Sequence, residues 1–593
     1  MRVADYIINR LYMEGAKHIF MVTGRGALFL SDAVAAHKEI TDISVHHEQA
    51  AAYAAFAYSQ YTGKLGACLV STGCAGTNAL TGVLNAWQDG IPCVFISGQN
   101  KLDETSRYTG IPLRTYGQQE ADIIPIVESI TKYAVMITDP KQIVYEMEKA
   151  LYLSKSGRKG PVWIDVPLDI QNMRIEPDQL EQFVVNEEIT FFEPLSDDIQ
   201  YVKELYQKAK RPVVLIGSGI YSSDAINELE LFIDKYQIPV TYAASAVDIY
   251  GLENTLSIGC VGIMGCSRAA NFTVQNSDLI IVLGSRLSSM TTGESCKFAR
   301  EAKVVVVDID SVEHSKNNVN IDRLIIADVK KFLISFMKED LNEANNEWRA
   351  KCLHWKNIFP RCEEGQRTTE KVDLYYLAEC LSEVFPNESS LLTDSGLIEL
   401  ILPTNTIFNK GQRSIHPASQ GSMGFALPGL IGAYYASGKP VIAVIGDGSI
   451  MMNLQELETI SYKNIPAKIF VINNNLYAVI RKRQVEMFRS RTIGVDPSDG
   501  VGCPEFKKVA DCFRMKYVKI DNSKNLIEKL QSVIDMDGPV LCEIMGLENQ
   551  EYIHVGHVRN SNNKIVTRPL EDQSPSLDRD LFLSEMVIDP IDQ

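Results

Sequence analysis

The chain has 593 residues, enough for three or four α/β domains of about 150 to 180 residues each. Hydrophobic residues make up 45% and charged residues 22%, which excludes disorder, collagen-like repeats and coiled coil as descriptions of the whole. The net charge of −17 argues against a nucleic-acid binder or an anionic-membrane binder, because both need a positive surface.

Targeting signals and disulfides are not expected either. Charged residues between Asp5 and Lys17 interrupt the first amphipathic pattern, so it has no signal-peptide core. The longest apolar stretch, 423–435, is too short to span a membrane and contains Pro428. The twelve cysteines form no CxxC pair, which is typical of reduced thiols and indicates neither a disulfide framework nor a zinc site. We therefore expect a soluble, cytoplasmic protein.

The first part of the chain alternates short apolar runs with helical patterns, which predicts βα units and a parallel sheet. The expected strands are 65–70, 93–96 and 162–166, and the expected helices are 76–87 and 141–154. The stretch 171–198 is acidic, contains proline and shows no periodicity, so we interpret it as a linker.

Two further blocks follow the same pattern. The expected strands are 213–216, 279–283 and 304–307 in the second block, and 441–445, 468–472 and 539–544 in the third. The polar segment 342–371 reads as a connector between them. The sequence thus predicts an α/β protein of three doubly wound parallel-sheet domains and a tail, with the boundaries 1–175, 195–340, 370–550 and 551–593.

The most informative local sequences are VIAVIGDGSIMMN at 441–453 and KIFVINNNLYAVI at 468–480. Each is a β-branched strand that ends in a turn of small polar residues, which places Asp447 and Asn474 at the ligand-binding edge of a sheet. A carboxylate, an amide oxygen and a free carbonyl after Asn474 form a hard oxygen set that suits Mg²⁺. Ser449 and the helix expected after it would donate to a diphosphate. Each motif alone is typical of an ordinary turn or an Asn-rich loop.

Together the two motifs resemble the GDG…NN signature of thiamine diphosphate (ThDP) enzymes, and the chain as a whole resembles the acetolactate synthase family. The resemblance implies a pyrimidine domain, a central Rossmann-like domain and a diphosphate domain, with ThDP and Mg²⁺ as cofactors. It implies that Asp447, Asn474 and the backbone carbonyl of Leu476 hold the metal. It also implies a group of residues around the diphosphate: Gly396, Gly446, Gly448, Ser449 and Tyr477.

The segment SVHHEQAAAYAAFAY at 44–58 resembles the family's N-terminal pattern, and Glu48 matches the catalytic glutamate. A carboxyl group beside N1′ of the aminopyrimidine favours the imino tautomer, whose N4′ takes the proton from thiazolium C2. We expect Ala50, Ala51 and Ala54 to exclude water from this carboxyl group and to favour proton sharing. The alternative is a glutamate that only caps a helix.

Further segments match the family at cofactor-contacting positions. In STGCAGTNAL, Gly73 and Asn78 are matched, although Ala75 replaces the usual proline. YGQQEADI matches Gln119 to a cofactor contact and leaves Gln118 in place of an aromatic pocket residue.

The match continues in the third block. SQGSMGFALPGLIGA places Gly421 where its carbonyl accepts from N4′, and Met423 where it supports the bent cofactor. TDSGLIEL departs from the family, because Leu397 and Ile398 follow Gly396 where polar residues are usual.

The predicted substrate residues are mostly basic. Lys132 in ITKY matches a pocket lysine, with a surface lysine as the alternative. IRKRQVEMFRSR at 480–491 holds five basic residues in an acidic chain, and Arg481 and Arg483 are expected to bind an anionic acceptor. The alternative is a solvated helix face.

The central block resembles flavin-holding stretches at GSGI (217–220) and GSRLSSMTTG (284–293). Arg286 is retained, but Ser288 and Ser289 replace an acidic pair, so FAD stays an open alternative. The tail sequence TRPLEDQSP (567–575) is similar to tails of synthase-like proteins from surface-polysaccharide pathways.

The predicted function is that of a carboligase. It decarboxylates a 2-oxo acid, pyruvate in the leading hypothesis, and transfers the acyl carbanion equivalent to a second carbonyl, for which an anionic keto sugar or sugar nucleotide is the candidate. The alternatives are a 2-oxo acid decarboxylase without ligation and a non-catalytic regulatory subunit. By resemblance, the site forms between two subunits, which implies a homodimer or homotetramer.

Overall fold

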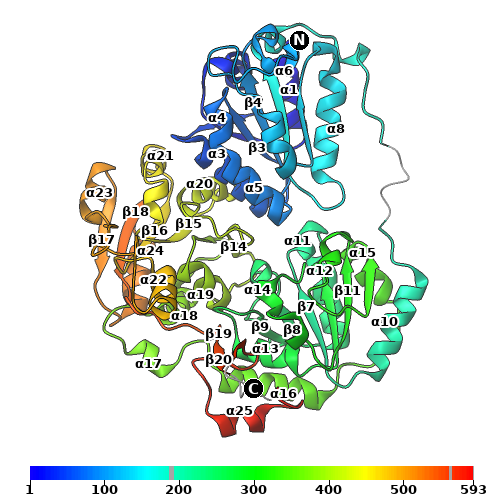
Figure 1. The fold of residues 1–593 in the computed structure, drawn as a ribbon, viewed down its shortest axis with the longest axis vertical. Helices are drawn as coiled ribbons and strands as arrows, with labels where there is room; N and C mark the ends of the chain where they lie inside the picture. Colours follow the sequence, from blue (N-terminus) through cyan, green and yellow to red (C-terminus); the bar gives the residue numbers. More distant parts are fainter. Residues whose placement is uncertain (186–191, 560–563, 592–593) are drawn as a thin grey trace.

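The computed structural model describes residues 1–185, 192–559 and 564–591. It consists of three α/β domains, each built on a six-stranded parallel sheet. In Figure 1 the N-terminal domain lies at the top in blue, the middle domain at the right in green, and the third domain at the left in yellow and orange. No helix in the described ranges is long and apolar enough to cross a membrane.

The first sheet has the strand order β2-β1-β3-β4-β6-β5. Its strands, in that order, are β2 (Thr41–Ser44), β1 (His18–Met21), β3 (Gly66–Val70), β4 (Cys93–Gln99), β6 (Val162–Pro167) and β5 (Tyr133–Met136). The helices of this domain are α1 (Val3–Met13), α2 (Leu28–Ala36), α3 (Glu48–Thr62), α4 (Cys74–Asn78), α5 (Leu80–Asp89), α6 (Ser106–Thr109), α7 (Ile124–Val127), α8 (Ile143–Lys155) and α9 (Leu168–Asn172). The central strands β3, β4 and β6 are buried along their whole length, as continuous apolar runs in parallel sheets are expected to be.

The middle sheet has the order β12-β11-β10-β7-β8-β9. Its strands are β12 (Arg323–Ile326), β11 (Lys303–Asp308), β10 (Leu279–Leu283), β7 (Pro212–Ile216), β8 (Val240–Tyr242) and β9 (Ser257–Cys260). Its helices are α10 (Ser196–Lys208), α11 (Gly219–Ser222), α12 (Ile226–Tyr236), α13 (Arg268–Gln275), α14 (Ser289–Thr292), α15 (Val329–Phe336), α16 (Asn346–Ile358) and α17 (Glu364–Arg367). The last two helices form the connector that the polar composition predicted.

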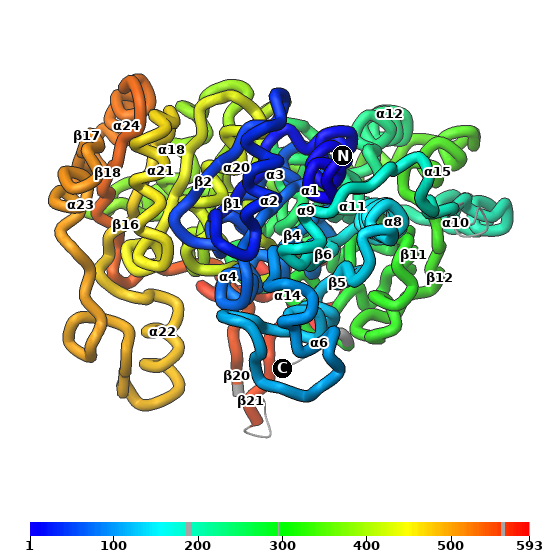
Figure 2. The backbone as a smooth tube through the Cα atoms, turned by 90° about the horizontal axis from the view of Figure 1, so that it is seen from above, coloured from blue at the N-terminus to red at the C-terminus, as the bar shows by residue number. Residues whose placement is uncertain are grey.

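The third sheet has the order β14-β13-β15-β16-β18-β17. Its strands are β14 (Arg413–Ile415), β13 (Ser390–Thr393), β15 (Val441–Gly446), β16 (Ala467–Asn473), β18 (Val540–Met545) and β17 (Lys516–Ile520). Its helices are α18 (Leu374–Val384), α19 (Leu397–Asn405), α20 (Ala426–Ser437), α21 (Glu456–Tyr462), α22 (Ala478–Met487), α23 (Phe506–Cys512) and α24 (Leu526–Ile534). Figure 2 shows α22 projecting on the same side of the molecule as α6.

The N-terminal and third domains meet through α3 and α20 (Figures 1 and 2). Residues 50–59 of α3 are all buried, because the helix packs on its own sheet on one side and on α20 on the other. The contact is close: a Cβ built on Gly432 would meet the carbonyl oxygen of Ala54 at 2.1 Å. Small residues therefore set the distance between the two domains.

The described residues of the C-terminal segment pack against the middle domain. It carries β19 (His554–Val555), β20 (His557–Arg559), β21 (Ile565–Thr567), β22 (Gln573–Ser574) and α25 (Arg579–Glu585). Leu570 and Phe582 join the same hydrophobic core as Val213 of β7. Glu571 forms an ion pair with Arg300 at 2.8 Å, and Glu585 accepts from Trp355 Nε1 at 2.9 Å. Composition indicated a polar extension. These contacts instead hold the segment against the middle domain, and we call its described residues from 551 onward the C-terminal strap.

Candidate functional site

The loops after β15 and β16 bring the three predicted metal ligands together. The two strands are neighbours, with Gly446 opposite Ile472. Asp447 is only 2% exposed, and its Oδ2 accepts from the backbone amide of Asn474 at 3.0 Å and that of Asn475 at 2.5 Å. Asn474 Oδ1 in turn accepts from the amide of Leu476 at 3.3 Å. The Asp447 carboxylate, after β15, thus binds the neighbouring loop after β16, which carries Asn474 and Leu476 at the same carboxyl edge of the sheet.

This oxygen set fits a magnesium ion. Burial raises the pKa of Asp447, and the backbone amides of Asn475, Gly448 and Asn474 oppose that effect by stabilising the carboxylate. A cation would stabilise the carboxylate further. Among the described residues, no cluster of three or more His, Cys, Asp or Glu side chains is arranged for a metal. A site of one carboxylate, one amide oxygen and one carbonyl is the arrangement that the sequence predicted.

The glycines predicted to lie near the diphosphate differ in how crowded they are. Gly396 adopts φ +87° at the start of α19, and a Cβ built on it would meet nothing within 4 Å. The open side of Gly396 is consistent with the anion site predicted at this helix N-terminus. Tyr477 lies over Gly448, where a Cβ would meet the Tyr477 ring at 2.2 Å. Gly446 has no neighbour closer than 3.7 Å to such an atom.

Ser449 is placed differently from the prediction. Its hydroxyl donates to Asp394 Oδ1 and also accepts from the amide of Gly424 at 3.2 Å. The helix expected after it is a single 3₁₀ turn, Ile450–Met452, and not an α-helix. Ser449 therefore links the Asp394 side chain to the Gly424 backbone inside the third domain, and its hydroxyl proton is not directed at a ligand.

Asp394, which the sequence reading overlooked, organises the loop that carries Gly421 and Met423. It is 2% exposed at the end of β13 and accepts from the amides of Gly424 and Ala426, each at 3.1 Å. The sequence signal was available, because Asp394 follows a buried strand just as Asp447 does. Burial raises its pKa to about 6.

Glu48 is the first residue of α3, and Asn78 at the end of α4 donates to Glu48 Oε2 at 2.9 Å. The two residues predicted from separate motifs therefore meet. Ala50, Ala51 and Ala54 are fully buried in the core, while Glu48 keeps part of its surface exposed in the single chain.

The turn at Gly73 in the N-terminal domain lies against Gln119, the other residue of this domain that was predicted to contact the cofactor. A Cβ on Gly73, which has φ +67°, would meet the carbonyl oxygen of Gln119 at 2.0 Å. Gln118 is exposed and accepts from Arg25 Nη1 at 2.9 Å. In the described parts of the chain, no hydrogen bond or ion pair joins Glu48 to the Asp447 turn or to the Gly421 loop.

Lys132 lies at the start of β5, whereas Glu48 follows the carboxyl end of β2. All strands of this sheet run parallel, so the two residues are at opposite edges. Lys132 donates to the carbonyl of Ser156, and burial lowers its pKa to about 8. The chain therefore does not bring Lys132 to Glu48.

The basic helix α22 buries no residue, and it meets the C-terminal strap. Lys482 Nζ lies 4.7 Å from the centre of the Tyr552 ring and 3.5 Å from Glu551. Burial raises the pKa of Tyr552 and lowers that of His554, and it is the larger effect on each side chain. The positive charge of Arg483 lowers the pKa of both Tyr552 and His554. Arg481 pairs with Asp496 at 3.5 Å.

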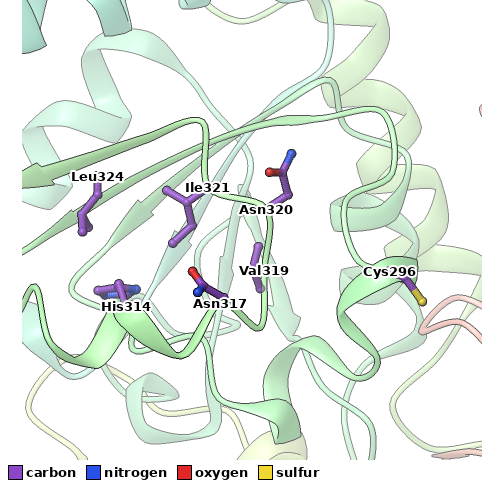
Figure 3. A pocket seen from close by; sticks show the side chains of 7 residues that line it. All are labelled: Cys296, His314, Asn317, Val319, Asn320, Ile321 and Leu324. Carbon is purple, nitrogen blue, oxygen red and sulfur yellow. The ribbon is translucent and has the colours of Figure 1, made fainter.

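A separate cavity of about 520 Å³ lies in the middle domain (Figure 3). It is lined by Cys296, His314, Asn317, Val319, Asn320, Ile321 and Leu324. None of these residues was predicted to belong to the cofactor site.

Comparison with known proteins identifies the family of the chain. Three family models match: the N-terminal TPP binding domain of thiamine pyrophosphate enzymes at residues 1–126, their central domain at 199–336, and their C-terminal TPP binding domain at 394–544. The chain is 30% identical over 564 residues to an acetolactate synthase large subunit of Porphyra purpurea, covering 92% of each chain. It is 31% identical to that of Cyanidium caldarium, covering 92% of this chain and 93% of the other. It is 28% identical to that of Haemophilus influenzae, covering 96% and 99%. The chain therefore belongs to the thiamine pyrophosphate enzymes and is an acetolactate synthase-like member of that family.

Proposed function

We propose that the protein is a Mg²⁺-dependent ThDP carboligase that decarboxylates a 2-oxo acid, pyruvate first among them, and joins the acyl unit to a second carbonyl compound. The observation that carries the proposal is the contact of the Asp447 carboxylate with the loop of Asn474 and Leu476, next to α19, where Gly396 borders open space. The pair of Glu48 and Asn78 supports it, because a regulatory subunit would not need to retain a catalytic carboxyl group.

Each residue has a role that follows from its chemistry. Asp447, Asn474 and the Leu476 carbonyl would hold Mg²⁺, and the amides at the start of α19 would bind diphosphate oxygens. Bound ThDP supplies the electron sink for the carbanion that remains when CO₂ leaves. Glu48 would exchange a proton with N1′ of the aminopyrimidine, and the Gly421 carbonyl would accept from its amino group. Met423 would support the ring.

We propose that the active unit is at least a homodimer. Glu48 and the Asp447 turn lie in different domains, and no described contact joins them within one chain. Both domains also expose large apolar side chains that a second copy would cover. They include Tyr108, Ile111, Leu113 and Tyr116 in the N-terminal domain, and Met451, Met452, Ile480 and Phe488 in the third.

We propose that the acceptor is anionic, for example a keto sugar or a sugar nucleotide. Arg483 and Lys482 project from a helix with no buried residue, in a chain whose net charge is −17. Guanidinium groups bind phosphate and carboxylate with two parallel hydrogen bonds. Arg481, which pairs with Asp496, is the weaker candidate of the basic run.

A flavin is not required by the geometry of the middle domain. A Cβ on Gly217 would meet the Gly284 carbonyl oxygen at 2.4 Å, and one on Gly219 would meet the Gly284 Cα at 2.5 Å. Packing of the chain on itself accounts for these glycines, so they do not by themselves indicate a flavin site. The visible absorption spectrum of the purified protein tests for bound flavin.

All twelve cysteines lie in the described ranges and none forms a disulfide, which supports the proposed cytoplasmic location.

The test is product analysis with the full chain, ThDP, Mg²⁺ and pyruvate, in the presence of neutral and anionic carbonyl acceptors. A carboligase gives a ligated product with at least one acceptor. Free aldehyde as the sole product across all acceptors would identify a simple 2-oxo acid decarboxylase. Absence of CO₂ release, with ThDP bound, would point to the regulatory alternative.

A further inference from the structure

Two carboxyl groups from different domains hold the ends of the loop from Ser419 to Gly424. At one end, Asp89 of α5 accepts from the amide of Ser419 at 3.0 Å through Oδ1. At the other end, Asp394 accepts from the amide of Gly424. The loop is thus fixed on both sides of Gly421, the residue whose carbonyl is expected to meet the aminopyrimidine.

A third carboxyl group lies against the middle of this loop. A Cβ built on Gly421 would meet Glu399 Oε2 at 2.3 Å and both Cδ and Oε1 at 3.0 Å, so the carboxyl group of Glu399 packs on the Gly421 Cα. Gly421 has φ +54°, a backbone conformation that favours glycine, and a side chain at this position would have to displace the Glu399 carboxyl group. No hydrogen bond or ion pair to Glu399 is found among the described residues.

The charges around Glu399 are mostly negative. Burial, followed by the carboxylates of Asp394 and Asp89, raises the pKa of Glu399 to about 8. Burial raises the pKa of Asp89 to about 6, and Arg286 opposes that rise. The positive end of α19 favours the ionised form of Glu399, because this residue lies in the first helical turn, but it does not outweigh the other effects.

We propose that Glu399 is a positioning residue of the cofactor site, whose carboxyl group packs against the Gly421 turn and holds it in the conformation that receives the aminopyrimidine. This inference rests on the proposed placement of ThDP against Gly421. Asp89 and Asp394 are ionised before Glu399 as the pH rises, so an ionised Glu399 is repelled by both and leaves the turn. Cofactor affinity therefore falls when Glu399 loses its proton.

The test is calorimetric ThDP binding to the full chain with Mg²⁺ between about pH 6.5 and pH 9.5. For the wild type we expect Kd to rise about tenfold across the titration of Glu399. Glu399→Gln, which has nearly the same shape and no charge, keeps the neutral-pH Kd throughout. Glu399→Asp, one methylene shorter, loses the contact and binds weakly at every pH.

The matched control is Glu347→Gln. Glu347 also lies in the first turn of a helix, α16, but is exposed, so this variant keeps the pH dependence of the wild type. Equal pH dependence in the wild type and Glu399→Gln would overturn the inference alone.

A second measurement does not require the cofactor. Infrared difference spectra of the ligand-free chain against Glu399→Gln should show a protonated carboxyl band at pH 7 that disappears near the pKa of about 8. Absence of that band at pH 7 overturns the inference even where ThDP binds. Failure of ThDP to bind at any pH overturns the proposed function and the inference together.

Discussion

Asn78 donates its side-chain amide to Glu48 Oε2 at 2.9 Å, which ties the last residue of α4 to the first residue of α3. Because α3 begins at Glu48, its carboxyl group projects from the start of a helix whose following residues are locked in the core. The backbone fixes where the carboxyl group starts, and Asn78 fixes where it points.

We expect Glu48→Gln to lower kcat with pyruvate by about 10²- to 10⁴-fold, since an amide cannot exchange the proton. ThDP affinity, measured by calorimetry, stays within a few-fold of the wild type. Asn78→Ala keeps the carboxyl group but not its orientation, so kcat falls by about tenfold. Glu39→Gln, an exposed site in the same domain, serves as the control. Unchanged turnover in Glu48→Gln would reassign the catalytic group.

Asp447→Ala should remove the thermal stabilisation that Mg²⁺ and ThDP give together. Ligand at about 100 times its Kd stabilises the wild type by about 2.7 kcal/mol, and this shift in Tm disappears when the buried carboxylate is absent. Differential scanning calorimetry with and without the ligands measures it. Asp511→Ala, on an exposed position of the same domain, retains the full shift. A full shift in Asp447→Ala would remove this residue from the metal site.

Two inactive variants should complement each other if the site spans two subunits. Glu48→Gln and Asp447→Ala, unfolded together and refolded as an equal mixture, give hybrid dimers in which one of the two sites is intact. Random pairing then restores about a quarter of the wild-type activity. Each variant refolded alone stays inactive. If the mixture is also inactive although hybrids form, both residues act within one chain.

Arg483→Ala should raise KM for an anionic acceptor by about 10- to 100-fold, the loss expected for one charged hydrogen bond. Release of CO₂ from pyruvate without acceptor is unchanged, because the donor does not need this side chain. Arg514→Ala is the control, since Arg514 lies in the same domain and pairs with Glu458. An equal rise in KM for a neutral aldehyde acceptor would show that Arg483 does not distinguish anionic from neutral acceptors.

His416 should make the protein sensitive to acid. It is 4% exposed, and burial lowers its pKa from 6.5 to about 4. Below about pH 6.5 the unfolded chain binds a proton that the folded chain rejects, so stability falls as the pH drops to about 4, by about 1.4 kcal/mol per pH unit. Urea unfolding at several pH values should show a smaller loss in His416→Gln. His37→Gln, at a partly exposed site, should follow the wild type; identical slopes in all three would refute the assignment.

The sheets were predictable because parallel strands leave a simple pattern. Val441 to Ile445 and Lys468 to Ile472 are apolar runs of strand length, and each ends in a polar turn. From that pattern alone, Asp447 and Asn474 were expected at one sheet edge, and the structure places them there. The resemblance to ThDP enzymes added Leu476 to the predicted metal ligands and identified Glu48 as the predicted catalytic glutamate.

Other features depend on contacts between distant segments and leave no local signal. Glu399 is one residue in an apolar helix, and only the folded loop shows that it meets Gly421. The direction of the Ser449 hydroxyl depends on Asp394, which lies 55 residues earlier. Lys132 matched a short motif, but the edge at which it lies depends on the direction of every strand in the sheet.

The strap that closes the middle domain has a consequence for the order in which the protein is made. Val213 belongs to the same core as Phe582, yet the ribosome makes Phe582 last of the two. At about 5 to 20 residues per second, roughly 20 to 70 seconds separate their synthesis. The N-terminal domain has all its strands early, whereas the middle domain waits with an exposed apolar face until the chain is nearly finished. We therefore expect the nascent middle domain to be the segment that chaperones protect.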